Sequence, residues 1–323
     1  MRRTLVAIAT ALAASGAWAV YPDKPITIVV PYAAGGPTDK VARDLADALR
    51  KPLGNATLVI ENVSGAGGTL GATRVAKAAP DGYTLLLAHT GLSAAPTLYR
   101  HLPYDTLQDF EYLGLVNEVP MLLVGKPALP AGNVAQLIAW LRLHQGQANL
   151  AHTGLGSPSH LCGILFASST GISVRPVPYK DTAPALADLV GGQVDLMCDQ
   201  PANTVSQIVT GKVKAYAVTG RHHVDTPALA RLPTLDEAGV PSFELSIWHG
   251  LYAPRGTPKA VLAKVNGALR QALKDADFVQ RERAMGAVPV GDARLDGAQH
   301  KKFVEAEIEK WRPVIRRSGQ FAD

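Results

Sequence analysis

The chain is poor in cysteine, in concentrated charge of one sign and in long apolar runs. Two cysteines are too few for a disulfide framework. Lys and Arg total 32 against 27 Asp and Glu, with no basic stripe interleaved with aromatics, which excludes a nucleic-acid-binding surface. Beyond the first twenty residues no apolar stretch reaches membrane-spanning length.

The first nineteen residues differ from the rest in composition. Met1-Arg2-Arg3 is a short basic head, residues 4–14 form an apolar run too short to span a bilayer, and Ala17-Trp18-Ala19 is an A-x-A site. This pattern predicts a secretory signal peptide, residues 1–19, cleaved after Ala19, and an exported, soluble mature protein. A retained anchor is the alternative, which the short apolar run disfavours.

Cys162 and Cys198 could pair in an exported chain. Both lie in apolar contexts, HLCGILFA and VDLMCDQ, where free buried cysteine is common. The sequence therefore favours two buried thiols over a disulfide.

The remaining chain, 47% apolar, alternates between strand and helix patterns. A strand at 26–30, a helix at 38–51 with Thr38 as N-cap, and a strand at 56–62 begin the first series, which continues to a strand at 83–88. A second series runs from about 147 to 218. Such alternation predicts βαβ units and an α/β fold with parallel sheets.

Two long extended runs, 111–125 and 243–254, separate the two series. They predict two crossings between two lobes, with a cleft between the lobes. Ligands of open parallel sheets bind at the carboxyl ends of strands. The loops that matter are therefore 31–39, 89–95, 152–160 and 179–182.

The loops contain no recognisable catalytic set. Gly35-Gly36 lies between a strand and a helix start, which favours an anion, but neither a phosphate-loop lysine nor the dinucleotide glycine spacing is present. Ser157, Ser159 and His160 permit an exported serine hydrolase as an alternative, without the G-x-S-x-G elbow; capping of a helix by these serines is favoured. His222-His223 lacks metal-ligand spacing. We expect a binding protein, not an enzyme, with no metal and no cofactor.

Five segments together resemble one family from about Tyr21 to the C-terminus: YPDKPITIVVPYAAGGPTDKVAR, ENVSGAGGTLGATRVAKAAPDGYTLLL, LPYDTLQDFEYLGLV, VPYKDTAPALADLVGGQVDLM and WHGLYAPRGTP. They are similar to the Bug family, the extracytoplasmic solute receptors of tripartite tricarboxylate transporters. The resemblance implies a type II periplasmic binding protein with two Rossmann-like α/β domains joined by two crossing strands. The implied segments are 20–120 and 244–323 for domain 1, and 121–243 for domain 2.

The resemblance also implies a function. A periplasmic monomer would capture a small mono-, di- or tricarboxylate and deliver it to integral-membrane transporter subunits, with no nucleic-acid partner. A ligand-sensing module for a membrane signalling partner is the alternative with the same site. Carboxylates would be held by backbone N–H groups, hydroxyls and waters rather than by arginine.

Carried over to this sequence, the family's ligand-binding positions fall on both lobes. Trp248 either closes over the ligand or packs the hinge, and Lys180 is either a charge at one end of the ligand or a solvated lysine. Departures from the family pattern at Ala33-Ala34, Ala95, Asp181 and Cys198 put the ligand's identity in question, not its class. The implied ligand-binding residues are Tyr32, Ala33, Ala34, Gly35, Gly36, Thr38, Asp39, Thr90, Gly91, Thr153, Gly154, Gly156, Ser157, His160, Tyr179, Lys180, Thr182, Asp199 and Trp248.

Overall fold

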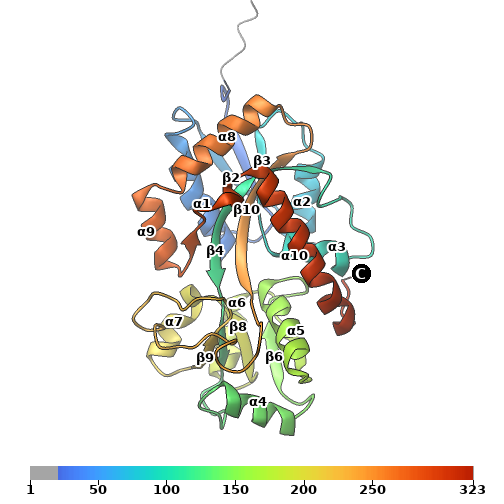
Figure 1. Ribbon diagram of the computed structural model, residues 1–323, viewed down its shortest axis with the longest axis vertical. Helices are drawn as coiled ribbons and strands as arrows, with labels where there is room; N and C mark the ends of the chain where they lie inside the picture. Colours follow the sequence, from blue (N-terminus) through green and yellow to red (C-terminus); the bar gives the residue numbers. More distant parts are fainter. Residues whose placement is uncertain (1–20, 323) are drawn as a thin grey trace, which may run out of the picture.

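Two β-sheets organise the described chain, residues 21–322 of the computed structural model, into two lobes. Figure 1 shows one lobe above the other, with two long strands running between them. The expected signal peptide and its cleavage site at Ala19 lie outside the described residues. Within those residues no helix is long and apolar enough to cross a bilayer.

The first lobe is built on a six-stranded sheet of order β11-β4-β10-β3-β1-β2. Strand β1, which lies between β3 and the edge strand β2, is apolar and almost wholly buried, because helices cover both faces of the sheet. Its strands are β1 (Ile26–Val30), β2 (Leu58–Asn62), β3 (Thr84–His89), β4 (Phe110–Pro120), β10 (Ser246–Pro254) and β11 (Val288–Pro289). Its helices are α1 (Pro37–Arg50), η1 (Ala66–Gly68), α2 (Thr69–Ala76), α3 (Gly91–Leu98), α8 (Lys259–Ala272), α9 (Ala276–Ala284), η2 (Ala293–Leu295) and α10 (Gly297–Ser318).

The second lobe is built on a five-stranded sheet of order β7-β6-β8-β5-β9. Its strands are β5 (Leu122–Gly125), β6 (Asn149–His152), β7 (Arg175–Pro178), β8 (Leu196–Asp199) and β9 (Lys214–Val218). Its helices are α4 (Val134–Leu143), α5 (Pro158–Thr170), α6 (Thr182–Val190) and α7 (Pro201–Val209).

The βαβ prediction is confirmed, and the sheets are mixed rather than purely parallel. β1 runs parallel to β2 and β3, and β6 runs parallel to β7 and β8. β10 is antiparallel to β3 and β4, and β5 is antiparallel to β8 and β9. The chain enters the second lobe along β5 and returns to the first along β10, so the crossings set the direction of these two strands; the short β11 is also antiparallel to β4.

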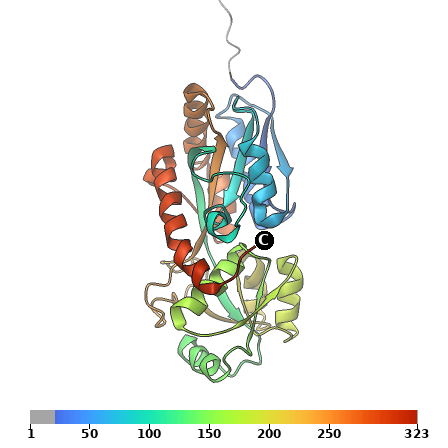
Figure 2. The same ribbon diagram turned by 90° about the vertical axis from the view of Figure 1, so that its right-hand side faces the viewer.

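The lobes are joined at two crossings and also by the last helix. The chain passes from β4 to β5 at Met121, and it returns along β10, which lies beside β4 in Figure 1. The C-terminal turns of α10 reach the second lobe, where Trp311 and Ile315 share a core cluster with Phe166 of α5. Figure 2 shows the C-terminus at the junction of the lobes.

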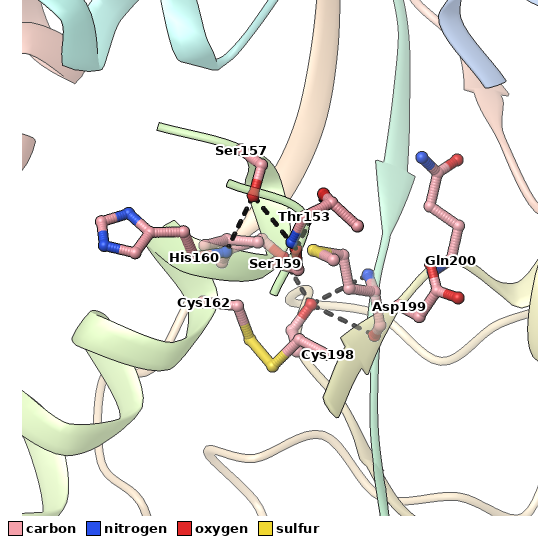
Figure 3. Close-up of a disulfide and its surroundings, with 11 residues drawn as sticks. Thr153, Ser157, Ser159, His160, Cys162, Cys198, Asp199 and Gln200 are labelled. Atoms are coloured by element: carbon pink, nitrogen blue, oxygen red, sulfur yellow. Dashed lines mark hydrogen bonds between the residues drawn. A yellow bond between two sulfur atoms is a disulfide. The ribbon is translucent and has the colours of Figure 1, made fainter. Parts of the chain in front are cut away.

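The prediction of two free thiols is wrong. Cys162 and Cys198 form a disulfide with a Cα–Cα distance of 6.2 Å, and both residues are fully buried (Figure 3). Their apolar contexts indicated burial correctly. Pairing depends on the packing of α5 against β8, which brings together residues 36 positions apart.

Two local expectations in the first lobe also need correction. Helix α1 begins at Pro37 with Gly36 as N-cap and no side-chain cap, so Thr38 is not the N-cap. Proline fits the first helical position because its fixed φ suits the helix and its missing N–H has no partner there. The segment 89–95, expected as a loop, enters α3 at Gly91.

Candidate functional site

A cavity of about 700 Å³ lies between the two lobes. Met121 and Ile247, from the two crossings, line it. Loops 31–38 and 64–68 line it from the first lobe, and loops 153–159, 180–182 and 199–200 line it from the second. The cavity therefore occupies the cleft that the two extended runs predicted.

Four helices begin at this cavity. The first residues of α1 line it from the first lobe, and those of α5 line it from the second. The N-caps of α6 and α7, Asp181 and Gln200, line it too. Unsatisfied N–H groups and the positive ends of the helix dipoles favour an anion at such a point.

Ten of the nineteen expected ligand-binding residues line the cavity, and they come from both lobes. They are Tyr32, Ala33, Gly36, Thr38, Thr153, Gly154, Ser157, Lys180, Thr182 and Asp199. The other nine do not line it. They are Ala34, Gly35, Asp39, Thr90, Gly91, Gly156, His160, Tyr179 and Trp248.

Asp39 holds the first loop in shape. One of its oxygens accepts the Gly35 N–H at 2.9 Å and Arg43 Nε at 2.9 Å, and the other accepts Asn62 Nδ2 at 3.0 Å. Burial raises the pKa of Asp39, but the hydrogen bonds from Arg43, the Gly35 N–H and Asn62 outweigh it and lower the pKa overall. Asp39 therefore stays ionised and organises the Gly35-Gly36 turn from behind.

Several expected ligand donors are used within the protein. Thr90 Oγ1 accepts the Trp248 N–H at 3.1 Å and so ties β10 to the end of β3. The Gly156 N–H donates to His160 Nδ1 at 3.3 Å, and His160 Nε2 lies 2.8 Å from Gln320 Oε1. These contacts bind the loops to one another and to the C-terminus.

Trp248 packs the hinge. Its side chain is 1% exposed, and its indole Nε1 donates to Glu307 Oε2 of α10 at 3.2 Å. It lines a separate cavity of about 430 Å³ rather than the cleft. Of the two roles considered for this residue, the structure favours hinge packing.

Asp199 is the carboxylate most deeply placed in the cleft. It is 4% exposed; its Oδ1 accepts the Gln200 N–H at 2.7 Å and Asn203 Nδ2 at 3.0 Å, while its Oδ2 is buried without a partner among the described residues. Burial raises the pKa of Asp199 to about 7, against the lowering by these two hydrogen bonds. Asp199 is therefore partly protonated near neutral pH.

A buried chain of hydrogen bonds fixes the direction of the Thr38 hydroxyl. Asn117 Nδ2 donates a hydrogen bond to Glu282 Oε2, so the other amide atom, Asn117 Oδ1, is free to accept. It lies 2.6 Å from His249 Nδ1 and accepts a hydrogen bond from the Nδ1–H of that ring. His249 Nε2 is then an acceptor, and the Thr38 hydroxyl donates to it at 3.1 Å. Toward the cleft, Thr38 Oγ1 retains only acceptor capacity.

Sequence reasoning missed the glycine-rich loop 64–68. Gly67 has φ +61°, and a Cβ added there would lie 2.5 Å from Tyr99 Oη and 3.2 Å from the Leu155 carbonyl oxygen of the opposite lobe. The lobes therefore approach each other closely at this glycine. The signal was present in the segment SGAGG, which follows a strand as the Gly35-Gly36 turn does.

A short internal repeat was also missed. The pentapeptide AHTGL occurs at 88–92 and at 151–155, at the ends of β3 and β6. In each copy the glycine N–H donates to Nδ1 of the histidine two residues earlier, at 2.9 Å for His89 and 3.2 Å for His152. His89 lines the cleft, whereas His152 lines another cavity, between α5 and α10.

The serines of the second-lobe loop make hydrogen bonds within that loop. Ser157 Oγ accepts the His160 N–H at 3.2 Å as the N-cap of α5, and Ser159 Oγ accepts the Thr153 N–H at 3.0 Å. Figure 3 shows the His160 ring directed away from both hydroxyls. Among residues 21–322 no group of three or more His, Cys, Asp or Glu is arranged to hold a metal.

Comparison with known proteins decides the family. The family model "Tripartite tricarboxylate transporter family receptor" matches residues 41–320. The chain belongs to this family. The family is a class of solute-binding receptors rather than enzymes and works with membrane transporters.

Three solved structures are similar over nearly the whole chain. The periplasmic binding protein BugD is 44% identical, covers 93% of this chain and 99% of its own, and superposes with a TM-score of 0.83. MatC from Rhodopseudomonas palustris with bound malate is 40% identical, covers 91% and 100%, and has a TM-score of 0.82. A further R. palustris protein, solved with adipate, is 36% identical, covers 93% and 98%, and has a TM-score of 0.83. The two-domain α/β fold of a periplasmic binding protein, and similarity to the Bug proteins, are thus confirmed.

Proposed function

We propose that this receptor captures a small organic carboxylate in the cleft between its lobes and delivers it to the membrane subunits of a tripartite tricarboxylate-type transporter. The convergence of four helix N-termini on one cavity carries this proposal, because it favours an anionic ligand without an arginine clamp. The malate and adipate in two related structures support a carboxylate.

The ten expected residues that line the cavity are proposed as ligand contacts, and the other nine as supports of the loops. Lys180 lines the second-lobe side and adds one positive charge there. Domain closure would bring loops 31–38 and 153–159 together on the ligand and exclude water. The domain boundaries at 120 and 243 are supported by the division of the strands between the two sheets.

The proposed setting is the periplasm, after cleavage at Ala19, with the receptor acting as a monomer. The composition of residues 1–19 and the periplasmic relative BugD support this location. Export is tested by sequencing the N-terminus of protein recovered from a periplasmic fraction, where mature chains should begin at Val20.

Isothermal titration calorimetry of the mature chain against mono-, di- and tricarboxylates tests ligand class, with malate, adipate and citrate in the panel. A neutral sugar and a divalent metal salt are the matched non-carboxylate ligands. We expect saturable one-to-one binding of at least one acid and none of the controls. Binding of the sugar or the metal, with no acid bound, would contradict the proposal.

A further inference from the structure

His89, the last residue of β3, forms part of the cleft wall and is held firmly there. Its ring stacks on Tyr32, with centroids 3.9 Å apart and an interplanar angle of 6°, and the residue is 6% exposed. The Gly91 N–H donates to its Nδ1 at 2.9 Å. The stacking and the hydrogen bond together fix both the position of the ring and its rotation.

The hydrogen bond from Gly91 also fixes the tautomer. A backbone N–H can only donate, so Nδ1 presents a lone pair and the ring proton of the neutral imidazole is on Nε2. Burial lowers the pKa of His89 well below its usual value, and His249, 6.2 Å away between ring centroids, lowers the pKa further. The ring is therefore neutral and carries one donor, Nε2–H.

That donor has no partner within the described chain. Among residues 21–322 no hydrogen bond to His89 Nε2 is found, and the atom does not belong to the fully buried polar atoms that lack partners. The atom is therefore not fully buried, and because His89 lines the cleft, the cleft is where a partner for this donor would bind. A desolvated donor on the wall of an anion-favouring cavity gains most when a charged oxygen accepts it.

The second copy of the AHTGL pentapeptide shows which property of His89 is specific to the cleft. His152 has the same sequence neighbours and the same bond from a glycine N–H to Nδ1, but its ring faces the cavity of about 510 Å³ between α5 and α10. The hydrogen bond that holds the loop after the strand is therefore common to both histidines. Of the two, His89 alone combines this hydrogen bond with a position on the cleft wall.

We infer that His89 contacts the ligand directly, its Nε2–H donating a hydrogen bond to a carboxylate oxygen. This inference rests on the proposed function and adds a specificity to it. Because Nδ1 is already occupied by Gly91, the ring offers no acceptor, so this end of the cleft takes an oxygen acceptor and rejects an ammonium group. A neutral donor also binds the anion without burying a second charge.

Two substitutions test the acceptor at Nδ1 and the donor at Nε2 separately. In His89→Asn the amide oxygen can replace Nδ1 as acceptor for Gly91, but no donor reaches the place of Nε2. In His89→Gln the amide nitrogen can reach the place of Nε2, but the acceptor for Gly91 is lost. His152→Asn is the matched control, since it makes the same change in the same pentapeptide away from the cleft.

Calorimetry with the tightest acid of the carboxylate panel, and with malate in every series, measures the effect. We expect His89→Asn to weaken binding about ten- to a hundredfold, the size of one hydrogen bond to a charged group, and His152→Asn to weaken it less than about threefold. His89→Gln should bind more tightly than His89→Asn. Unfolding midpoints in urea verify that all three variants fold.

Equal losses in His89→Asn and His152→Asn, or no loss in either, would overturn the inference and leave the proposed function intact. Long-range ¹H–¹⁵N NMR of the free protein tests the inference without any ligand, with His89→Asn used for assignment. We expect the Nε2–H tautomer for His89. A proton on Nδ1 would contradict the inference even if no carboxylate binds and the proposed function itself fails.

Discussion

Reduction of the Cys162–Cys198 disulfide should destabilise the receptor substantially. The bridge closes a loop of 36 residues within the second lobe. In the chain-entropy description, fixing the ends of such a loop restricts the unfolded state by about 13 cal/mol/K, or about 4 kcal/mol at 25 °C. The free energy of unfolding of a globular chain is only about 5–15 kcal/mol, so this loss is a large fraction of the total stability.

The assay is equilibrium unfolding in urea, monitored by circular dichroism, on protein refolded with and without reductant. Both sulfurs are fully buried, so reduction is carried out on unfolded chain to ensure completion. A Cys162→Ala/Cys198→Ala variant, treated identically, is the control for direct effects of the reductant. We expect reductant to lower the urea midpoint of the wild-type protein and to leave the midpoint of the double alanine variant unchanged.

Equal midpoints for the oxidised and reduced wild-type protein would show that the bridge does not stabilise the folded state. Two reactive thiols per chain in protein unfolded without reductant would show that the bridge is absent from the protein itself.

Three further predictions concern polar groups around the cleft. Asp199→Asn should stabilise the protein at pH 8 by up to about 4 kcal/mol, because the pKa of Asp199 rises from 3.8 to about 7 on folding and the ionised form is disfavoured as pH rises through this window. Urea unfolding should show a smaller gain in stability at pH 5, and a gain independent of pH would contradict this prediction. Asp39→Ala should cost about 2 kcal/mol at pH 7, because the turn and Arg43 lose their acceptor. Since the pKa of Asp39 is lowered on folding, its contribution is present above about pH 4 and is lost as pH falls through the folded pKa, so an undiminished deficit in acid would argue against this role. Thr38→Val should cost about 1 kcal/mol through the lost bond to His249, whereas Thr38→Ser should be nearly neutral; equal unfolding midpoints for the two variants would refute that bond.

The two-lobed architecture was predictable because its signals are local and repeated. Alternating strand and helix patterns gave the βαβ units, and the two long extended runs gave the crossings, now seen as β4 followed by β5 and as β10. The contribution of α10 to the second lobe was not predictable, because the amphipathic pattern of a helix does not state which core its last turns enter.

The candidate site was partly predictable for a related reason. Loops at strand ends must line the cleft in an α/β fold, so Gly36 and Thr153 could be placed from the strand and helix pattern, whereas Asp199 was expected only from the family resemblance. Which groups on a loop face inward depends on rotations that no spacing specifies: Asp39 turns back to hold Gly35, while Gly67 approaches the opposite lobe.

The disulfide shows the same limit. The apolar contexts of Cys162 and Cys198 correctly indicated burial, but pairing requires a particular helix on a particular strand. That contact is set by the strand order of the second sheet, in which β8 lies between β6 and β5.

A crystal structure of the mature receptor with its tightest-binding carboxylate would show whether both lobes hold the ligand in the cleft. We expect the acid in the cleft, its oxygens in contact with both loop 31–38 and loop 153–159, and one carboxylate oxygen within hydrogen-bond distance of His89 Nε2. A ligand in the cavity between α5 and α10, or one held by a single lobe, would contradict this expectation.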